Sequence, residues 1–160
     1  MVERALVALE FPFEILPCDP DLADTAAFCE AYGLAPIDSA NTIVVASRKD
    51  PIAYCACVAL ATTRLDVNHK VCELMGVKKA SFARSEDTLA QTGMLIGGVT
   101  PFGLPPAWPV YVDAAVMDRP WVIVGGGNRS SKIRIAPDVF NSMPAATVVS
   151  GLAVALPSQQ

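Results

Sequence analysis

The stretch that decides the fold is TGMLIGGVTPFGLPPAWPVYVD, residues 92–113. It contains the pair Gly97-Gly98, a third glycine at Gly103 and four prolines, yet most of its residues are apolar. Proline removes a backbone donor and glycine permits positive φ, so the stretch predicts a rigid, irregular loop that leads into a strand at VYVD. Bare glycine backbone lets a ligand approach closely, with amide groups pointing at its oxygen atoms. The alternative interpretation is an ordinary proline-rich connection between strands.

The length of 160 residues predicts one domain, spanning residues 1–160. Hydrophobic residues make up 52% of the chain and charged residues 18%, which is typical of a compact globular protein. No apolar run is long enough to cross a bilayer, and the first residues lack the basic start of a secretory signal. We therefore expect a cytoplasmic protein that does not bind membranes.

Cysteine and histidine usage argues against a disulfide framework and against a metal site. The chain has five cysteines, an odd number, and one histidine, His69. The thiols are expected to be small core residues in a reducing cytosol. The sequence contains no nucleophile elbow and no phosphate-binding Gly-Lys-Ser/Thr loop. We therefore expect neither a metal ion nor a cofactor.

Charge is distributed unevenly along the chain. Residues 1–40 hold eight acidic and one basic residue, a net charge of −7, whereas the remainder holds eleven basic and eight acidic residues, a net charge of +3. Local fields matter more than the total charge within a Debye length of about 8–10 Å. Two groups of basic residues are therefore candidates for a phosphate-facing surface, and the alternative is that they are solvated charges. The groups are Lys70, Lys78, Lys79 and Arg84, and Arg129, Lys132 and Arg134.

Hydrophobic periodicity and turn residues predict three to four helices and six to eight short strands. Residues 1–20 are expected to form an extended lead-in. Helices are expected at 21–32, 66–75, 85–91 and 137–141, and strands at 42–46, 53–61, 79–83, 109–112, 121–125, 131–135 and 147–149. The glycine turn at 125–129 implies antiparallel pairing, so the predicted fold class is α+β with a curled or barrel-like sheet.

Three segments together resemble one family: SANTIVVASRK at 39–49, the stretch at 92–113, and GGGNRSSKIRIAPDV at 125–139. They resemble the YbaK/ProX-type aminoacyl-tRNA deacylases, editing domains that also occur inserted in bacterial prolyl-tRNA synthetases. The resemblance runs from about residue 20 to 153 and implies a mixed, mostly antiparallel β-barrel-like sheet with flanking helices. It implies hydrolysis, in trans, of the ester that joins a mischarged amino acid to the 3′-terminal adenosine of tRNA. The implied partners are aminoacylated tRNA and a synthetase, with prolyl-tRNA synthetase as the candidate.

The same resemblance implies a site at the glycine loop and the glycine hairpin. Backbone amides at Gly97 and Gly98 are expected to hold the developing oxyanion of the ester, so no side-chain nucleophile is needed. The substrate's own 2′-hydroxyl is expected to take part. The expected substrate-binding residues surround these amides: Val99, Thr100, Pro101, Phe102, Gly125, Gly126 and Arg129.

Three positions depart from the family's pattern. The family usually has a lysine where this chain has Asn41, an aspartate where it has Lys132, and often a serine where it has Gly125. We hypothesise that Lys132 replaces the missing cation and that Asn41 supplies a neutral hydrogen bond, which makes both candidate catalytic residues. The alternative is that Lys132 is a surface charge. The protein would then be a catalytically altered or inactive homologue that binds tRNA ends, an aminoacyl-nucleotide-like ligand or a synthetase.

Overall fold

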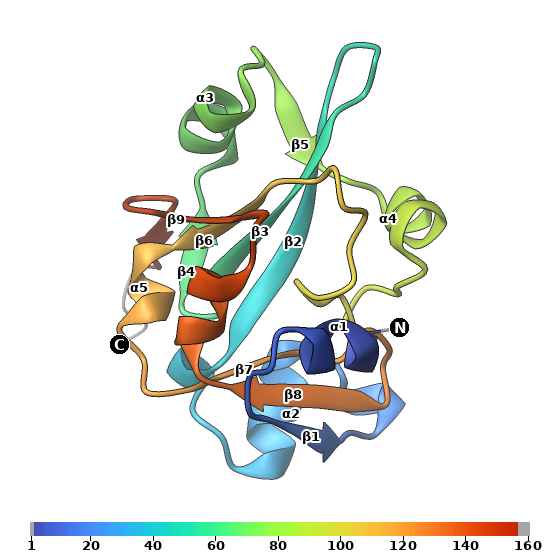
Figure 1. Cartoon of the computed structure of the whole chain (residues 1–160), viewed down its shortest axis with the longest axis vertical. Coiled ribbons are helices and arrows are strands. Elements are labelled where there is room, and N and C mark those ends of the chain that lie inside the picture. Colours follow the sequence, from blue (N-terminus) through green and yellow to red (C-terminus); the bar gives the residue numbers. More distant parts are fainter. Residues whose placement is uncertain (1, 157–160) are drawn as a thin grey trace.

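The computed structural model describes residues 2–156, which fold into three small sheets flanked by short helices (Figure 1). The largest sheet consists of β2 (Ala40–Ser47), β3 (Tyr54–Leu60), β5 (Ala80–Phe82), β6 (Val110–Asp113) and β9 (Ala146–Val149). Its order is β5-β2-β3-β6-β9. β2 is antiparallel to β3 and β5, whereas β6 is parallel to β3 and β9. The expected α+β fold with a mixed, mostly antiparallel sheet is confirmed.

The second sheet contains β1 (Phe13–Pro17), β7 (Val122–Gly125) and β8 (Ser131–Ile135), all antiparallel, in the order β1-β8-β7. β7 and β8 form the predicted glycine hairpin. A single bridge between Ser39 and Ile123 joins the start of β2 to β7. The third sheet pairs β4 (Thr63–Leu65) with β10 (Ala153–Ala155). Apart from this bridge, the three sheets of the described chain do not pair with one another, so the barrel-like arrangement is not a closed barrel.

The helices are short and lie on the outside of the sheets (Figure 1). They are α1 (Val2–Ala8), α2 (Thr25–Tyr32), α3 (Cys72–Met75), α4 (Ser85–Thr92) and α5 (Ala114–Met117), with 3₁₀ turns at Pro20–Leu22, Pro36–Asp38 and Pro137–Ser142 and a π turn at Val67–Val71. α2 and α4 end at Gly33 and Gly93, whose left-handed conformation closes each helix. None of the helices in residues 2–156 is long and apolar enough to span a membrane.

Five elements differ from the sequence-based expectation. The lead-in is not wholly extended, because α1 forms before β1, and Leu6 of α1 is completely buried in the main core. This helix is stabilised by tertiary packing that its seven residues do not reveal. β4, β10 and α5 were not predicted, since segments of three or four residues are too short to show periodicity. The helix expected at 66–75 begins as the π turn and becomes α-helical only at Cys72.

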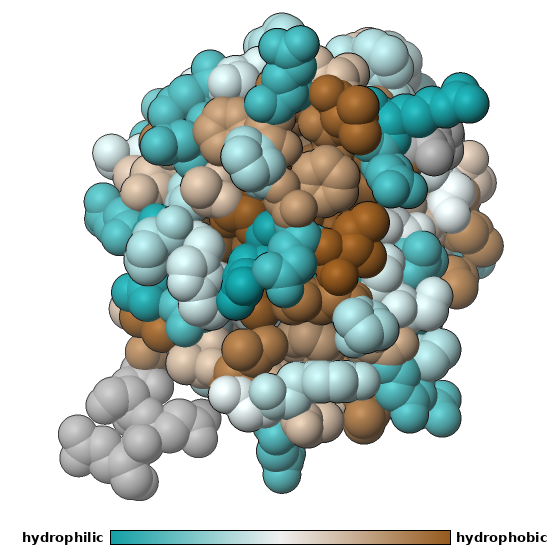
Figure 2. Space-filling view, turned by 60° about the horizontal axis from the view of Figure 1, so that its bottom comes forward, coloured by the Kyte–Doolittle hydropathy of each residue, from teal (hydrophilic) through white to brown (hydrophobic). Residues whose placement is uncertain are grey.

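The main core lies between α1, β3, β6 and the β7–β8 hairpin. It includes Phe102 and Phe140, whose rings stack with centroids 6.2 Å apart. All five cysteines are buried and free, which confirms the prediction that they are core residues. Apolar side chains also reach the surface, and Figure 2 shows hydrophobic side chains around a smaller hydrophilic group on one face. Apolar surface with a polar centre is typical of binding sites.

Candidate functional site

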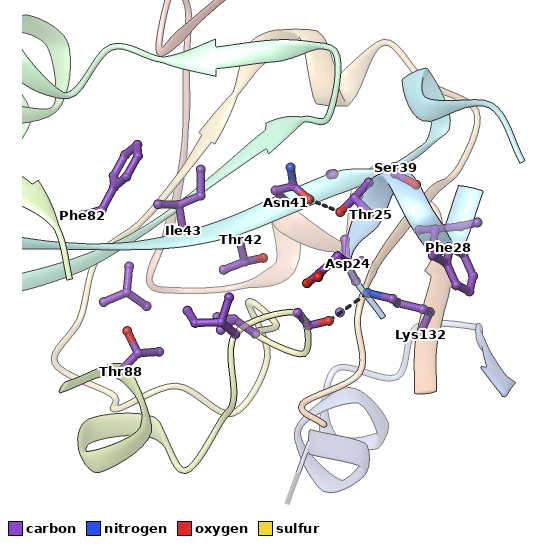
Figure 3. Close-up of a pocket in the computed structure, with 18 of the residues that line it drawn as sticks. Asp24, Thr25, Phe28, Ser39, Asn41, Thr42, Ile43, Phe82, Thr88 and Lys132 are labelled. Atoms are coloured by element: carbon purple, nitrogen blue, oxygen red, sulfur yellow. Dashed lines mark hydrogen bonds between the residues drawn. The ribbon is translucent and has the colours of Figure 1, made fainter. Parts of the chain in front are cut away.

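A cavity of about 430 Å³ lies between β2, the start of α2, α4, the loop before Val99 and the end of β7 (Figure 3). This volume is within the range of about 300–1,000 Å³ that is usual for small-molecule sites. Five of the residues expected at the site line it: Asn41, Gly97, Val99, Gly125 and Lys132. These residues come from four separate segments of the chain, so the fold brings together three of the four candidate catalytic residues: Asn41, Gly97 and Lys132.

The glycine pair in the loop forms a tight turn. The Gly98 amide donates to the Leu95 carbonyl at 2.9 Å, and Gly97 lies at the third position of the turn with φ of +90°. This φ explains the glycine, because a side chain is strained there. Gly98 does not line the cavity, and its amide is already used within the turn. The Gly97 amide has no hydrogen-bond partner among the described residues.

Lys132 holds the Gly97 carbonyl from the β8 side. Its Nζ donates to Gly97 O at 2.9 Å and to Ala23 O, just before α2, at 2.5 Å. The side chain is only 6% exposed, and the ammonium lies 5.5 Å from the centroid of the Phe28 ring. Lys132 is therefore a buried cation that ties the glycine turn to the start of α2, and it is not a surface charge.

Arg129 holds the other carbonyl of the same turn. Its Nη1 donates to Ile96 O at 2.6 Å, and its Nε donates to Pro20 O at 3.0 Å. Asp24 lies 3.4 Å from the same Nη1. Together with the Lys132 contacts, these bonds hold the carbonyls of Ile96 and Gly97. They therefore set the orientation of the two peptide groups that flank the Cα atom of Gly97.

Burial lowers the pKa of Lys132 below its usual value of 10.5, although the nearby Cys18 thiol and Asp24 carboxylate act in the opposite direction. Below the lowered pKa the lysine is charged in both the folded and unfolded states, and the folded state carries the full cost of burying it. Between the lowered pKa and 10.5 the unfolded chain binds more protons, so stability rises with pH over this window.

We therefore expect wild type to gain stability relative to Lys132→Met as the pH is raised from neutral towards 10.5. Urea unfolding of both proteins at several pH values measures this difference. Lys79→Met, at an exposed lysine, is the matched control and should show a constant difference from wild type. If the difference in stability between wild type and Lys132→Met is also independent of pH, the lowered pKa of Lys132 is contradicted.

Asn41 is oriented by a residue that the sequence did not indicate. The Thr25 hydroxyl of α2 donates to Asn41 Oδ1 at 2.5 Å (Figure 3). With Oδ1 occupied, the Nδ2 group is the part of the amide that remains available as a donor at the cavity. Thr25 lies 16 residues before Asn41, and no local motif connects the two.

The remaining predicted glycines are explained by close backbone packing. A Cβ at Gly98 would overlap the Asn128 backbone, one at Gly125 would overlap the Val99 carbonyl, and one at Gly126 would overlap Ser131. The Gly127 amide also donates to Gly98 O at 2.7 Å. The loop and the hairpin therefore pack directly against each other, backbone to backbone, and Gly98 and Gly126 do not line the cavity.

Besides Gly126, four residues expected to bind substrate lie outside the cavity lining. Thr100, Pro101 and Phe102 are buried, and Phe102 belongs to the main core. The part of this loop that follows Val99 is therefore apolar because it packs in the core. Arg129 does not line the cavity either, and it acts on the glycine turn through Ile96.

The basic group at 129–134 does not form a free phosphate-facing surface. Arg134 pairs with Glu14 at 2.8 Å and lies 5.2 Å from the centroid of the Trp121 ring. Arg129 and Lys132 are held by the contacts described above. These contacts count against a free phosphate patch in this group, because the β7–β8 hairpin packs against the acidic N-terminal part of the chain.

Several cavity residues were not indicated by the sequence. They are Asp24, Thr25 and Phe28 near α2, Thr42 of β2, Phe82 of β5 and Thr88 of α4. Thr42 is next to Asn41 in the sequence, and only this position could have indicated that it lines the cavity. The others come from segments that meet β2 only in the folded chain.

The cavity and the bonded glycine turn lie within a small α+β domain. A model of the aminoacyl-tRNA editing domain matches residues 19–142, and the chain therefore belongs to that family. A relative from Enterococcus faecalis, named "Putative Cys-tRNA(Pro)/Cys-tRNA(Cys) deacylase EbsC", is 30% identical over 74 residues. That match covers 46% of this chain and 45% of the relative, so it spans less than half of the relative's length.

Solved structures share the fold over nearly the whole chain. One is the "hypothetical protein APE2540", with a TM-score of 0.84, 25% identity, and coverage of 95% of this chain and 98% of that one. Another is "a putative trans-editing enzyme for prolyl tRNA synthetase", with a TM-score of 0.80, 22% identity, and coverage of 98% and 95%. The family match confirms the resemblance to aminoacyl-tRNA editing domains that the sequence suggested.

Proposed function

We propose that the protein is a trans-acting aminoacyl-tRNA deacylase that hydrolyses the ester of mischarged tRNA. One observation carries this proposal. Arg129 binds the Ile96 carbonyl and Lys132 binds the Gly97 carbonyl, while the Gly97 amide is left without a partner at the cavity. The Ile96 carbonyl points at Arg129, and in a trans peptide the Gly97 N–H points the opposite way. A fixed, unpaired amide at a cavity is a suitable donor to a developing oxyanion.

The proposed reaction requires no nucleophile from the protein. Water attacks the carbonyl carbon of the ester, and the resulting oxyanion accepts hydrogen bonds from the Gly97 amide and Asn41 Nδ2. The bond between the carbonyl carbon and the ribose oxygen then breaks, and that oxygen takes a proton. The products are the free amino acid and tRNA with a free terminal hydroxyl.

Lys132 acts in this mechanism mainly as a positioning residue. Two of its three N–H groups are used by the carbonyls of Ala23 and Gly97. It therefore orients the Gly97 peptide, and its buried charge adds to the field that favours a nearby oxyanion. We therefore keep the hypothesis that Lys132 replaces the cation missing at position 41, with the difference that Lys132 acts by orienting the Gly97 peptide.

The test is a panel of mischarged tRNAs, including alanyl-, seryl- and cysteinyl-tRNA for proline, on which deacylation and binding are measured together. Turnover of at least one member above the rate of spontaneous hydrolysis supports the proposal. Binding without turnover on any member would instead support the alternative, a non-catalytic module that binds tRNA ends. Addition of prolyl-tRNA synthetase to the same assay tests whether this candidate partner changes the rate.

Thr25 and Asn41 should behave as one unit in this assay. We expect Asn41→Ala to lower kcat/KM about 10-fold, because one hydrogen bond contributes about 0.5–1.5 kcal/mol. Thr25→Val, which keeps the side-chain shape, should have a smaller effect. It removes the hydrogen bond that orients the Asn41 side-chain amide but leaves that amide in place. The double variant should be no worse than Asn41→Ala, and fully additive losses in this double-mutant cycle would show that the two residues act independently.

A further inference from the structure

The closed end of the cavity carries a positive charge. Phe28 and Lys132 at this end are 2% and 6% exposed, whereas Phe82 at the open end is 57% exposed. Figure 3 shows Phe82 on the side opposite Phe28 and Lys132. Among the described residues that line the cavity, Lys132 is the one basic side chain and Asp24 the one acidic side chain. The Asp24 side chain is 71% exposed and contacts Arg129 at 3.4 Å, so its charge is not buried beside the lysine.

The ammonium group of Lys132 has an unused donor and no counter-ion. Nζ carries three N–H groups, and the carbonyl oxygens of Ala23 and Gly97 accept two of them. Both acceptors are neutral, and Nζ forms no ion pair with a carboxylate of the described residues. Burying an ammonium without a counter-ion is costly, and an anion bound at this end of the cavity offsets that cost.

The start of α2 adds a positive potential at the same place. Ala23, whose carbonyl binds Nζ, lies two residues before α2, and Thr25 and Phe28 of α2 line the cavity. The N-terminus of a helix carries a partial positive charge. The side chain of Asp24, the N-cap residue, makes no capping hydrogen bond to α2. The helix and the lysine therefore both favour an anion at the closed end.

Ser39 supplies a further donor at this end. It lines the cavity, is 3% exposed, and lies near Phe28 in Figure 3. The one partner of its Oγ among the described side chains is the Cys29 thiol, at 3.4 Å. A thiol is a weak hydrogen-bonding group, so the Ser39 hydroxyl is available to a stronger acceptor such as a carboxylate.

We infer that the closed end binds a carboxylate on the side chain of the acyl group, so that the preferred substrate is an aspartyl ester. The carboxylate accepts the third N–H of Lys132 and the Ser39 hydroxyl. An aspartyl ester also carries an α-ammonium group, which the Asp24 carboxylate complements in charge. The side chain must be short, because Lys132 contacts the carbonyl of Gly97, the residue whose amide is proposed to hold the ester. This inference rests on the proposed function, which places the ester beside that amide.

The carboxylate contact is additional to the positioning role of Lys132. With a neutral acyl group the lysine only orients the Gly97 peptide, so its replacement leaves KM unchanged. With an aspartyl group the lysine also binds the substrate, and its replacement raises KM as well. The lysine is already desolvated in the folded protein, so only the ligand's carboxylate is desolvated on binding.

The experiment compares aspartate with asparagine, which has the same shape and no charge. The probes are adenosines that carry either amino acid through a 3′-amide in place of the ester, and their binding to the full chain is measured by calorimetry. We expect wild type to bind the aspartyl probe about 10-fold more tightly, since a hydrogen bond between charged groups is stronger than one to a neutral group. Lys132→Met should bind the two probes equally. Lys79→Met, at an exposed lysine outside the cavity, is the matched control and should keep the 10-fold preference.

The outcomes separate this inference from the proposed function. Equal binding of the two probes by wild type, or tighter binding of the asparaginyl probe, overturns the acidic preference even if neutral mischarged tRNAs are deacylated. A preference for aspartate that persists in Lys132→Met also overturns it, because the lysine is then not the group that binds the carboxylate. A preference that depends on Lys132, without deacylation of any tRNA, supports the inference and counts against the proposed reaction. The comparison in wild type needs no variant, and melting temperatures check that each variant is folded.

Discussion

Replacing Gly97 with alanine is expected to lower kcat/KM for deacylation about 100-fold or more. The added Cβ would overlap Arg129 Nη1, and the φ of +90° is strained for alanine. Displacement of Arg129 releases the Ile96 carbonyl and misorients the amide that is proposed to meet the oxyanion. Loss of one such donor costs about 100- to 1,000-fold in rate. Single-turnover deacylation of the best tRNA in the panel measures the effect.

Gly76→Ala is the control for backbone strain alone. Gly76 ends α3 with φ of +70°, and a Cβ there would meet nothing within 4 Å. We expect Gly76→Ala to lose roughly 1–2 kcal/mol of stability, because it forces alanine into the left-handed region, and Gly97→Ala to lose at least as much, because its Cβ also overlaps Arg129. Only Gly97→Ala should lose activity. Activity losses of similar size in the two variants would show that strain, and not the position of the Gly97 amide, is responsible.

Replacing Lys132 with methionine is expected to reduce kcat about 100-fold with little change in KM. Methionine fills the buried space of the side chain, but the carbonyls of Ala23 and Gly97 lose their donor. The glycine turn is then no longer tied to α2, so the amide is less well oriented in the transition state. An interaction made only in the transition state lowers kcat and leaves KM largely unchanged.

Lys79→Met is the matched control and should retain wild-type rates, since Lys79 is exposed and does not line the cavity. A rise in KM with unchanged kcat in Lys132→Met would indicate that the lysine binds substrate directly. Unchanged deacylation and unchanged tRNA affinity in Lys132→Met would remove this residue from the site altogether.

The strands with clear patterns were predictable from sequence alone. β2 and β3 were expected within two residues of their bounds, because a polar turn at 48–51 separates two apolar runs. Gly97 was correctly expected to have a special backbone role, since glycine beside proline indicates an irregular loop. The sequence could not show which of the two glycine amides is free. That depends on the turn bond from Gly98 to Leu95, which the folded chain forms with Gly97 at positive φ.

The contacts that hold the site were not predictable, because they join residues far apart in the chain. Lys132 lies 35 residues from Gly97 and 109 from Ala23. The polarity of these side chains suggested a phosphate or a solvent surface, whereas in the fold they are satisfied by carbonyl groups. Thr88 had no signal at all, since a threonine in an amphipathic helix is usually a minor packing residue.

The edge of β2 that faces β5 bears on self-association, because its strand pairing begins only at Val45. Exposed strand edges invite pairing with a second chain, and proteins usually cover them or interrupt them with charges. Here the free segment is only a few residues long, between the Ser39–Ile123 bridge and the first pair with β5 at Val45. A free segment this short offers few backbone groups to another strand, so this edge is a limited target for pairing with a second chain.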